Sequence, residues 1–250
     1  DETGDQKYLK YARKAGDFLV ISTDDNGVWD KNLLRGLQHT INARCAWALL
    51  ELDRRVPGAR YAWIAEQNLK WVLKQQTDNG WFRNGSSKPR VLPNTHFIAY
   101  TCRGLIESHR LTGNRDYLEA ARKTADRMRR MFDERATLYA FWDHNWDNRG
   151  KYIRWATGRY VCLTGNVQMS LVWMKLFEEY GDQSDRDSAF RMLDQVKALQ
   201  SVSSPKPGIR GGVKGSFPIF GWYSTFKYPN WAAKFLADAL MLKIKLQGSP

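Results

Sequence analysis

The chain has 250 residues, enough for one large domain, and its 43% hydrophobic and 26% charged residues are typical of a globular protein. No apolar run approaches the roughly 18–20 residues that a membrane-spanning helix needs, so the sequence predicts no membrane span. The net charge of +13 indicates an anionic partner, namely an acidic glycan, a nucleic acid or a membrane surface, or else a solvated basic surface.

The ends and the cysteines set further expectations. A single domain over residues 1–250 is expected, and the chain begins at Asp1 rather than Met, which fits the C-terminal part of a longer protein. The three cysteines, Cys45, Cys102 and Cys162, belong to no Cys/His cluster, so neither a structural zinc site nor another cofactor is predicted. Free thiols and a polar first segment without a signal peptide favour a cytoplasmic location.

The predicted helices over residues 6–21 and 60–75 are each followed by the same turn. An Asp-Asn-Gly tripeptide and then an aromatic residue recur 53 residues later, with Gly27 matched by Gly80. Asn-Gly ends helices because both residues tolerate a positive φ. The recurrence predicts an internal repeat, and repeats of this length point to stacked helical units.

Small-residue-rich apolar helices are predicted over residues 40–54, 95–110, 164–180 and 230–246, alternating with amphipathic helices over 6–21, 60–75, 116–132 and 185–199. The links after the apolar helices are short, whereas the links before them are long, at roughly 22–38, 77–93, 133–163 and 201–229. Because the helices alternate in direction, all long loops emerge at one end, where function normally lies. The sequence thus predicts an all-α fold, an incomplete or small α/α toroid of about four helical hairpins, with Cys45, Cys102, Trp173 and Phe235 buried. A helical solenoid used as a binding surface is the alternative.

Three groups of segments resemble known families. The segment 69–82, with Gln76 and Gly80-Trp81, resembles the Gln…Gly-Trp repeat of terpenoid-cyclase-like α/α toroids. Segments 95–100 and 112–121 look similar to α/α-barrel carbohydrate enzymes, namely lyases, unsaturated-glycoside hydrolases and sugar epimerases. Segments 212–219 and 228–235 resemble a bacterial toroid family associated with polysaccharide gene clusters. The resemblance implies the toroid fold and action on carbohydrate, because the Asp-rich motifs of terpenoid cyclases are missing.

Polar side chains at the starts of the apolar helices are expected to converge at the mouth of the ring, where helix N-termini favour an anion. His39 and Asn94 also fit a capping role, and His144 also fits loop packing. The candidate catalytic residues are His96, His144, Tyr160 and Tyr228. The candidate substrate-binding residues are His39, Arg44, Asn94, Arg159, Asn166, Lys214, Tyr223 and Lys227, with Trp81, Trp142, Trp222 and Trp231 offering flat faces to sugar rings.

These residue types fit lyase or epimerase chemistry on an acidic, uronate-containing polysaccharide. Asn, Arg or Lys would neutralise the uronate carboxylate, and His or Tyr would move the proton next to it. Glycoside hydrolysis is an alternative, with Asp24, Asp25, Asp30, Asp143 and Asp147 as loop carboxylates. A non-catalytic toroid that binds a glycan or a protein is a third possibility. The lack of a helix-turn-helix, RNP or zinc pattern argues against nucleic acid.

Overall fold

The computed structural model describes residues 3–57, 60–89, 91–148 and 160–248. These residues contain eight α-helices, two 3-10 turns and one two-stranded sheet. The helices are α1 (Gln6–Ile21), α2 (Ala43–Asp53), α3 (Tyr61–Lys74), α4 (Thr95–Thr112), α5 (Arg115–Arg135), α6 (Leu163–Tyr180), α7 (Gln183–Lys197) and α8 (Asn230–Gly248). The 3-10 turns are η1 (Leu34–Gly36) and η2 (Thr40–Asn42), and the strands are β1 (Val161–Cys162) and β2 (Ser216–Phe217).

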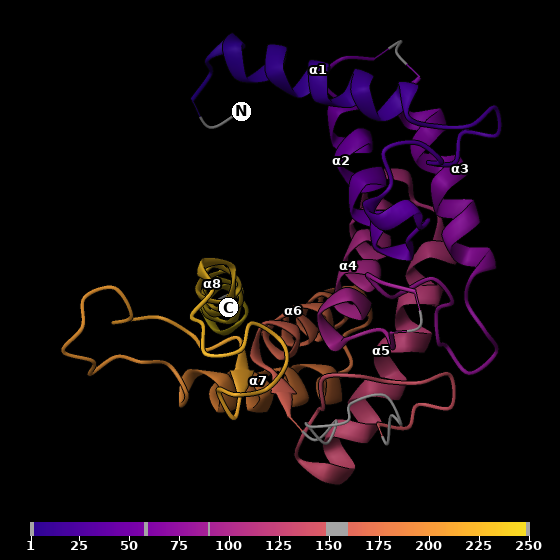
Figure 1. The fold of residues 1–250 in the computed structure, drawn as a ribbon. Helices are drawn as coiled ribbons and strands as arrows, with labels where there is room; N and C mark the ends of the chain where they lie inside the picture. Colours follow the sequence, from indigo (N-terminus) through magenta and orange to yellow (C-terminus); the bar gives the residue numbers. More distant parts are fainter. Residues whose placement is uncertain (1–2, 58–59, 90, 149–159, 249–250) are drawn as a thin grey trace.

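The helices form two concentric layers of an arc. The inner helices α2, α4, α6 and α8 pack side by side in that order, and the outer helices α3, α5 and α7 follow the same course behind them. Figure 1 shows the arc curving from α1 to α8, with an opening between these two helices. The predicted all-α toroid of about four hairpins is therefore confirmed.

The short links between inner and outer helices follow from their capping residues. Gly113 ends α4 at φ 74°, and the Asn114 side chain accepts a hydrogen bond from the Asp116 amide at 2.9 Å to begin α5. Gly181 ends α6 at φ 70°, and the side chain of Asp182 caps α7 in the same way. Glycine readily adopts the left-handed conformation at a helix end, and Asn and Asp are preferred N-caps.

The repeated turn predicted from the sequence forms the same structure twice. Thr23 pairs with Trp29 after α1, and Gln76 pairs with Phe82 after α3. The carbonyl oxygen of Gly27 accepts a hydrogen bond from the Asn68 side chain on α3 at 2.5 Å, and that of Gly80 accepts one from Thr124 on α5 at 2.6 Å. Each turn therefore attaches its own hairpin to the outer helix of the next.

The core lies between the two layers and is most complete around α4 and α6. Cys102 and Trp173 are fully buried and Phe235 is 7% exposed, as predicted. Cys45, also predicted to be buried, is half-buried. Its helix α2 has another inner helix on one side only, whereas α4 and α6 each have one on both sides.

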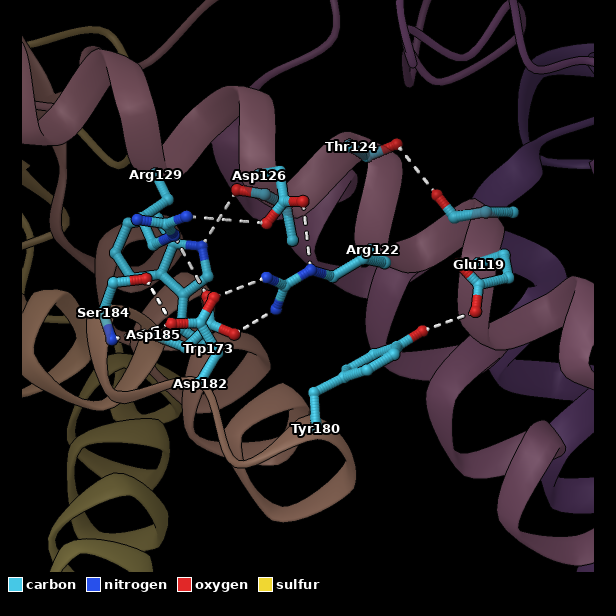
Figure 2. A network of polar contacts seen from close by, with 12 residues as sticks. Glu119, Arg122, Thr124, Asp126, Arg129, Trp173, Tyr180, Asp182, Ser184 and Asp185 are labelled. Atoms are coloured by element: carbon cyan, nitrogen blue, oxygen red, sulfur yellow. Dashed lines mark hydrogen bonds and ion pairs between the residues drawn. The ribbon is translucent and has the colours of Figure 1, made fainter.

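An ion-pair network joins the outer helices α5 and α7 (Figure 2). The Asp185 carboxylate on α7 is fully buried and contacts two cations of α5, with Arg122 Nη1 at one oxygen and Arg129 Nε 3.1 Å from the other. Arg122 also binds Asp182 at 2.8 Å and Asp126 at 3.0 Å. Because breaking a buried ion pair leaves an uncompensated charge, this network fixes α7 against α5.

The long loops meet where the inner helices begin. Strand β1 pairs antiparallel with β2, and Asn94 bridges Phe141. The Thr40 amide donates to the Asn84 carbonyl oxygen at 3.1 Å, which ties the first two long loops together. None of the described helices is both long and apolar enough to cross a bilayer.

Candidate ligand-binding site on the inner face

His96, in the first turn of α4, lies on the inner face and is 6% exposed. Its Nδ1 contacts the side-chain nitrogen of Gln168 on α6, and that nitrogen also donates to the Thr164 carbonyl oxygen at 3.3 Å. The amide therefore donates to Nδ1, so the neutral ring carries its proton on Nε2. Burial, aided by the charge of Arg44, lowers the pKa of His96 to about 3. The imidazole is thus a neutral hydrogen-bond donor.

Aromatic rings from α4, α8 and the loop before α8 surround this imidazole. The ring centroid of Tyr100 lies 4.3 Å from that of His96, that of Tyr223 lies 5.5 Å away and that of Phe235 lies 6.4 Å away. Burial raises the pKa of both tyrosines, so both phenols are protonated at neutral pH. The Oη of Tyr223 accepts a hydrogen bond from Trp231 Nε1 at 2.9 Å. A half-exposed indole therefore borders the group.

Arg44 contributes a cation from α2. Its guanidinium lies 4.3 Å from the ring centroid of Tyr100 and 5.9 Å from that of Phe235. Burial lowers the pKa of Arg44, which remains charged because arginine titrates far above neutral pH. We call Arg44, His96, Tyr100, Gln168, Tyr223 and Phe235 the inner-face cluster, which draws on all four hairpins.

A pocket continues from this cluster between α2, α4, α6 and α8. Besides residues of the cluster it is lined by Trp47, Arg103, Leu171, Lys234 and Asp238. Arg103 is paired with Glu107 at 2.6 Å, and Lys234 is paired with Asp238. Among the described residues no carboxylate lies within ion-pairing distance of Arg44. The charge of Asp238, which lines the same pocket, acts on Arg44 but does not pair with it. The guanidinium of Arg44 is therefore the cation of this pocket without an ion-pair partner among the described residues.

Four of the predicted contact residues are instead buried structural groups. The ring of Trp142 is fully buried and donates to the Thr95 hydroxyl at 3.0 Å, so it offers no face to a sugar. Tyr160 is 3% exposed, burial raises its pKa, and its ring packs against that of Phe141 with the centroids 5.9 Å apart. His39 is 2% exposed with Nε2 3.1 Å from the Leu34 carbonyl oxygen, and Asn94 caps α4 through the Phe97 amide at 2.9 Å.

Two further predicted residues lie apart from the cluster. His144 is exposed on a turn, where its backbone oxygen accepts a hydrogen bond from Asn79 at 2.7 Å and its ring lies 6.5 Å from that of half-buried Trp81. Asn166 is 3% exposed and precedes Gln168 by two residues. Two residues correspond to about 200° around a helix, so Asn166 lies on the opposite side of α6 from the cluster.

The remaining predicted residues lie on the loop before α8 or next to it. Tyr228 is half-buried, and a Cβ at Gly212 would lie 3.1 Å from its ring. Lys214 is half-buried, and Lys227 is exposed with its carbonyl oxygen bonded to the Gly215 amide. Trp222 and Trp231 are 51% and 46% exposed. Arg159 lies outside the described residues.

Two of the five loop carboxylates considered for glycoside hydrolysis, Asp24 and Asp143, stabilise local turns. Asp24 accepts a hydrogen bond from the Val28 amide at 2.8 Å. Asp143 accepts hydrogen bonds from the Asn145 and Asp147 amides at 2.9 and 2.8 Å. These are the bonds by which Asp side chains stabilise turns.

Comparison with known proteins finds similarity in structure. No protein-family model matches the sequence, and no curated protein sequence matches it. An unsaturated glucuronyl hydrolase specific for heparin superposes with a TM-score of 0.75 at 15% identity, over 99% of this chain and 71% of that one. The unsaturated glucuronyl hydrolase of Bacillus sp. GL1, responsible for glycosaminoglycan degradation, gives 0.71 at 17% identity over 98% and 70%. The cellobiose 2-epimerase of Bacillus thermoamylovorans gives 0.67 at 12% identity over 96% and 68%.

The fold is therefore that of the α/α toroids. At these identities the similarity establishes the architecture alone, and a function has to be argued from the residues of the site.

Proposed function

We propose that this protein binds an acidic, uronate-containing saccharide at the inner-face cluster and acts on it as a lyase or epimerase. The observation that carries the proposal is the guanidinium of Arg44, which is held against Tyr100 at 4.3 Å and has no carboxylate partner among the described residues. A half-buried arginine without an anion is best satisfied by a ligand carboxylate, which matches its planar donors.

The other groups of the cluster fit the same ligand. His96 offers the Nε2 proton, and Tyr100 and Tyr223 offer phenol hydroxyls close to it. A site rich in donors and rings suits a sugar that carries several oxygen acceptors and a carboxylate. The glucuronyl hydrolases with the same fold are named for a uronic acid, which supports this choice of ligand.

Calorimetric titration with oligogalacturonate, oligomannuronate and heparin oligosaccharides tests the binding step. Arg44→Gln should weaken binding of the acidic ligand by about tenfold or more, because a hydrogen-bonded charge pair is lost. Arg54→Gln is the matched control, since this arginine lies at the far end of α2 with 63% of its side chain exposed. Equal binding of neutral oligosaccharides at ~1 M salt, where the Debye length is ~3 Å, would exclude an acidic ligand.

The two tyrosines beside His96 favour proton transfer as the chemical step. With the carboxylate neutralised by Arg44, Tyr100 would first release its phenol proton to solvent and then, as phenolate, remove the proton on the adjacent carbon. Burial raises the pKa of Tyr100 and opposes this ionisation, whereas the charge of Arg44, 4.3 Å from its ring centroid, favours it. In a lyase the electron pair forms a carbon–carbon double bond, the glycosidic C–O bond breaks, and the second phenol protonates the leaving oxygen. In an epimerase the proton returns to the opposite face. His96, whose Nδ1 is occupied by Gln168, serves as a donor rather than as the base.

The two chemical outcomes are separable on one sample. Elimination gives an unsaturated uronate that absorbs in the ultraviolet, whereas epimerisation in heavy water exchanges the carbon-bound proton for deuterium, which proton NMR detects. Tyr100→Phe should abolish either signal while retaining most of the binding. Binding without either signal would favour the non-catalytic glycan-binding toroid.

A further inference from the structure

Trp222 lies on the loop that joins β2 to α8 and is 51% exposed. Its ring is supported from below by Phe141, with the ring centroids 6.0 Å apart. Lys88, on the loop before α4, places its Nζ 5.8 Å from the centroid of the same ring. Residues from three different long loops therefore build one exposed platform, an aromatic face with a cation at its side.

The cation of this platform is available to a ligand. Lys88 is half-buried, and its backbone is held by the Ser86 hydroxyl, which donates to the Lys88 carbonyl oxygen at 2.9 Å. Among the described residues no carboxylate lies within ion-pairing distance of Lys88. The neighbouring sequence has the same character, since no acidic residue occurs between Asp194 and Asp238, whereas six Lys and Arg residues do. A basic, aromatic surface of this kind fits an anionic ligand with flat apolar faces.

The platform is continuous with the inner-face cluster. Tyr223, whose ring lies 5.5 Å from His96, follows Trp222 directly in the chain. Its hydroxyl is in turn bonded to Trp231 at 2.9 Å, and Trp231 is also half-exposed. A saccharide held at His96 and Arg44 therefore has the exposed ring of Trp231 next to Tyr223, and Trp222 lies one residue away along the chain.

We propose that Trp222 and Lys88 form an outer subsite that takes a second acidic sugar unit, so that the ligand is a polyanionic chain rather than a single sugar. The ring of Trp222 would stack on one face of the sugar, and Lys88 would pair with its carboxylate. The inference rests on the proposed function, because the inner-face cluster holds the first unit.

The experiment compares short and long ligands on the intact protein. Galacturonic acid, its trimer and its hexamer are titrated against wild type, Trp222→Ala and Lys88→Gln, with the same series from mannuronic acid. In wild type the hexamer should bind about tenfold more tightly than the monomer. Either substitution should remove most of this increase in affinity from monomer to hexamer. The affinity for the monomer should stay within about twofold of wild type. Lys88→Gln should also reduce the salt dependence of hexamer binding.

Two further variants separate stacking from folding. Trp222→Phe keeps a flat ring and should retain most of the gain with length. Tyr11→Ala removes an aromatic side chain of 64% exposure from α1 and should leave the gain unchanged. Thermal unfolding of each variant should stay close to wild type, because Trp222 and Tyr11 are exposed and Lys88 forms no ion pair among the described residues.

The outcomes distinguish this inference from the proposed function. If wild type binds the monomer through Arg44 but gains nothing with length, or if Trp222→Ala and Lys88→Gln keep the gain, the outer subsite is refuted and the inner site stands. If no acidic ligand of either series binds wild type, the proposed function is refuted, and the outer subsite is refuted with it.

Discussion

Gly104 on α4 lies so close to the backbone of Ala43 at the start of α2 that a Cβ on Gly104 would be 2.5 Å from the Ala43 carbonyl carbon. Gly165 on α6 meets the backbone of α4 in the same way, with its Cβ position 2.7 Å from the His96 amide nitrogen. Two glycines therefore set the spacing of three neighbouring inner helices: Gly104 in the middle of α4 meets the start of α2, and Gly165 in the first turn of α6 meets the start of α4.

The first prediction concerns this spacing. Gly104→Ala should destabilise the protein by about 1–3 kcal/mol, because overpacking against backbone atoms forces the helices apart. The gain in helix propensity, about 1 kcal/mol, is too small to offset such a shift. Urea unfolding followed by circular dichroism measures the change. Gly248→Ala, at the end of α8 where nothing lies near the Cβ position, is the control and should not destabilise.

The second prediction concerns the acid side of the stability profile. The pKa of His96 is lowered from 6.5 to about 3 in the folded protein, so the unfolded chain takes up a proton that the folded one refuses. Above about pH 6.5, His96 is neutral in both states and its effect on the free energy of unfolding does not change with pH. Below that pH the free energy of unfolding falls by about 1.4 kcal/mol per pH unit, until the pKa of the folded state is reached. Between about pH 6.5 and pH 5 the loss is about 2 kcal/mol.

Urea unfolding measured at several pH values across this range gives the free energy of unfolding as a function of pH. This free energy should fall less steeply with decreasing pH for His96→Gln than for wild type. His144→Gln removes an exposed histidine and should keep the wild-type slope. Identical slopes for wild type and His96→Gln would contradict the buried, neutral state of His96.

A third prediction tests the network between α5 and α7. Asp185→Asn leaves Arg122 and Arg129 without their buried partner and should cost about 3–5 kcal/mol of folding free energy. Asp187→Asn, two residues further along α7 with 61% of its side chain exposed, should change it by less than about 1 kcal/mol. The difference in urea midpoints measures the effect. A loss of equal size in both variants would mean that burial of Asp185 does not matter.

The last prediction separates Tyr160 from the site. Its hydroxyl is buried and has no hydrogen-bond partner among the described residues. Removing an unsatisfied buried hydroxyl is close to neutral, so Tyr160→Phe should keep stability within about 1 kcal/mol and leave binding of the acidic saccharide unchanged. A large loss of activity with normal binding would return Tyr160 to the catalytic residues.

Helix periodicity and the recurring Asp-Asn-Gly turn were sufficient to predict the fold, because both are local signals. The glycines Gly27 and Gly80 indicate the same turn in both copies. Gly113 ends α4, and Asn114 caps the start of α5. The site was predicted only in part. The structure places His96, Arg44 and Tyr223 together in one cluster, but no local pattern shows that Gln168 reaches His96 from another helix. His96 and Tyr100 are four residues apart, and residues at this distance lie on the same face of an α-helix. This spacing indicates that both side chains share one face of α4.

The burial of individual loop tryptophans could not be predicted from the sequence. Trp142 and Trp222 both lie in long loops, and sequence alone gives no reason to separate them. In the structure Trp142 is fully buried and bonded to Thr95, whereas Trp222 contacts Phe141 and is 51% exposed. The order in which loops stack on one another depends on contacts distant in sequence, so it could not be derived from residue types.

The hydrogen bonds that join each repeated turn to the next outer helix affect how the molecule responds to a ligand. Most helix packing among the described residues is between neighbouring hairpins, so opening of one hairpin is transmitted along the arc step by step rather than all at once. The inner-face cluster, in contrast, needs all four hairpins in register. A ligand held there binds only the fully assembled arc and should suppress partial opening of every hairpin together. Hydrogen exchange at α1 to α8 would then slow in concert, and the saccharide would give a serial array the cooperativity of a single closed domain.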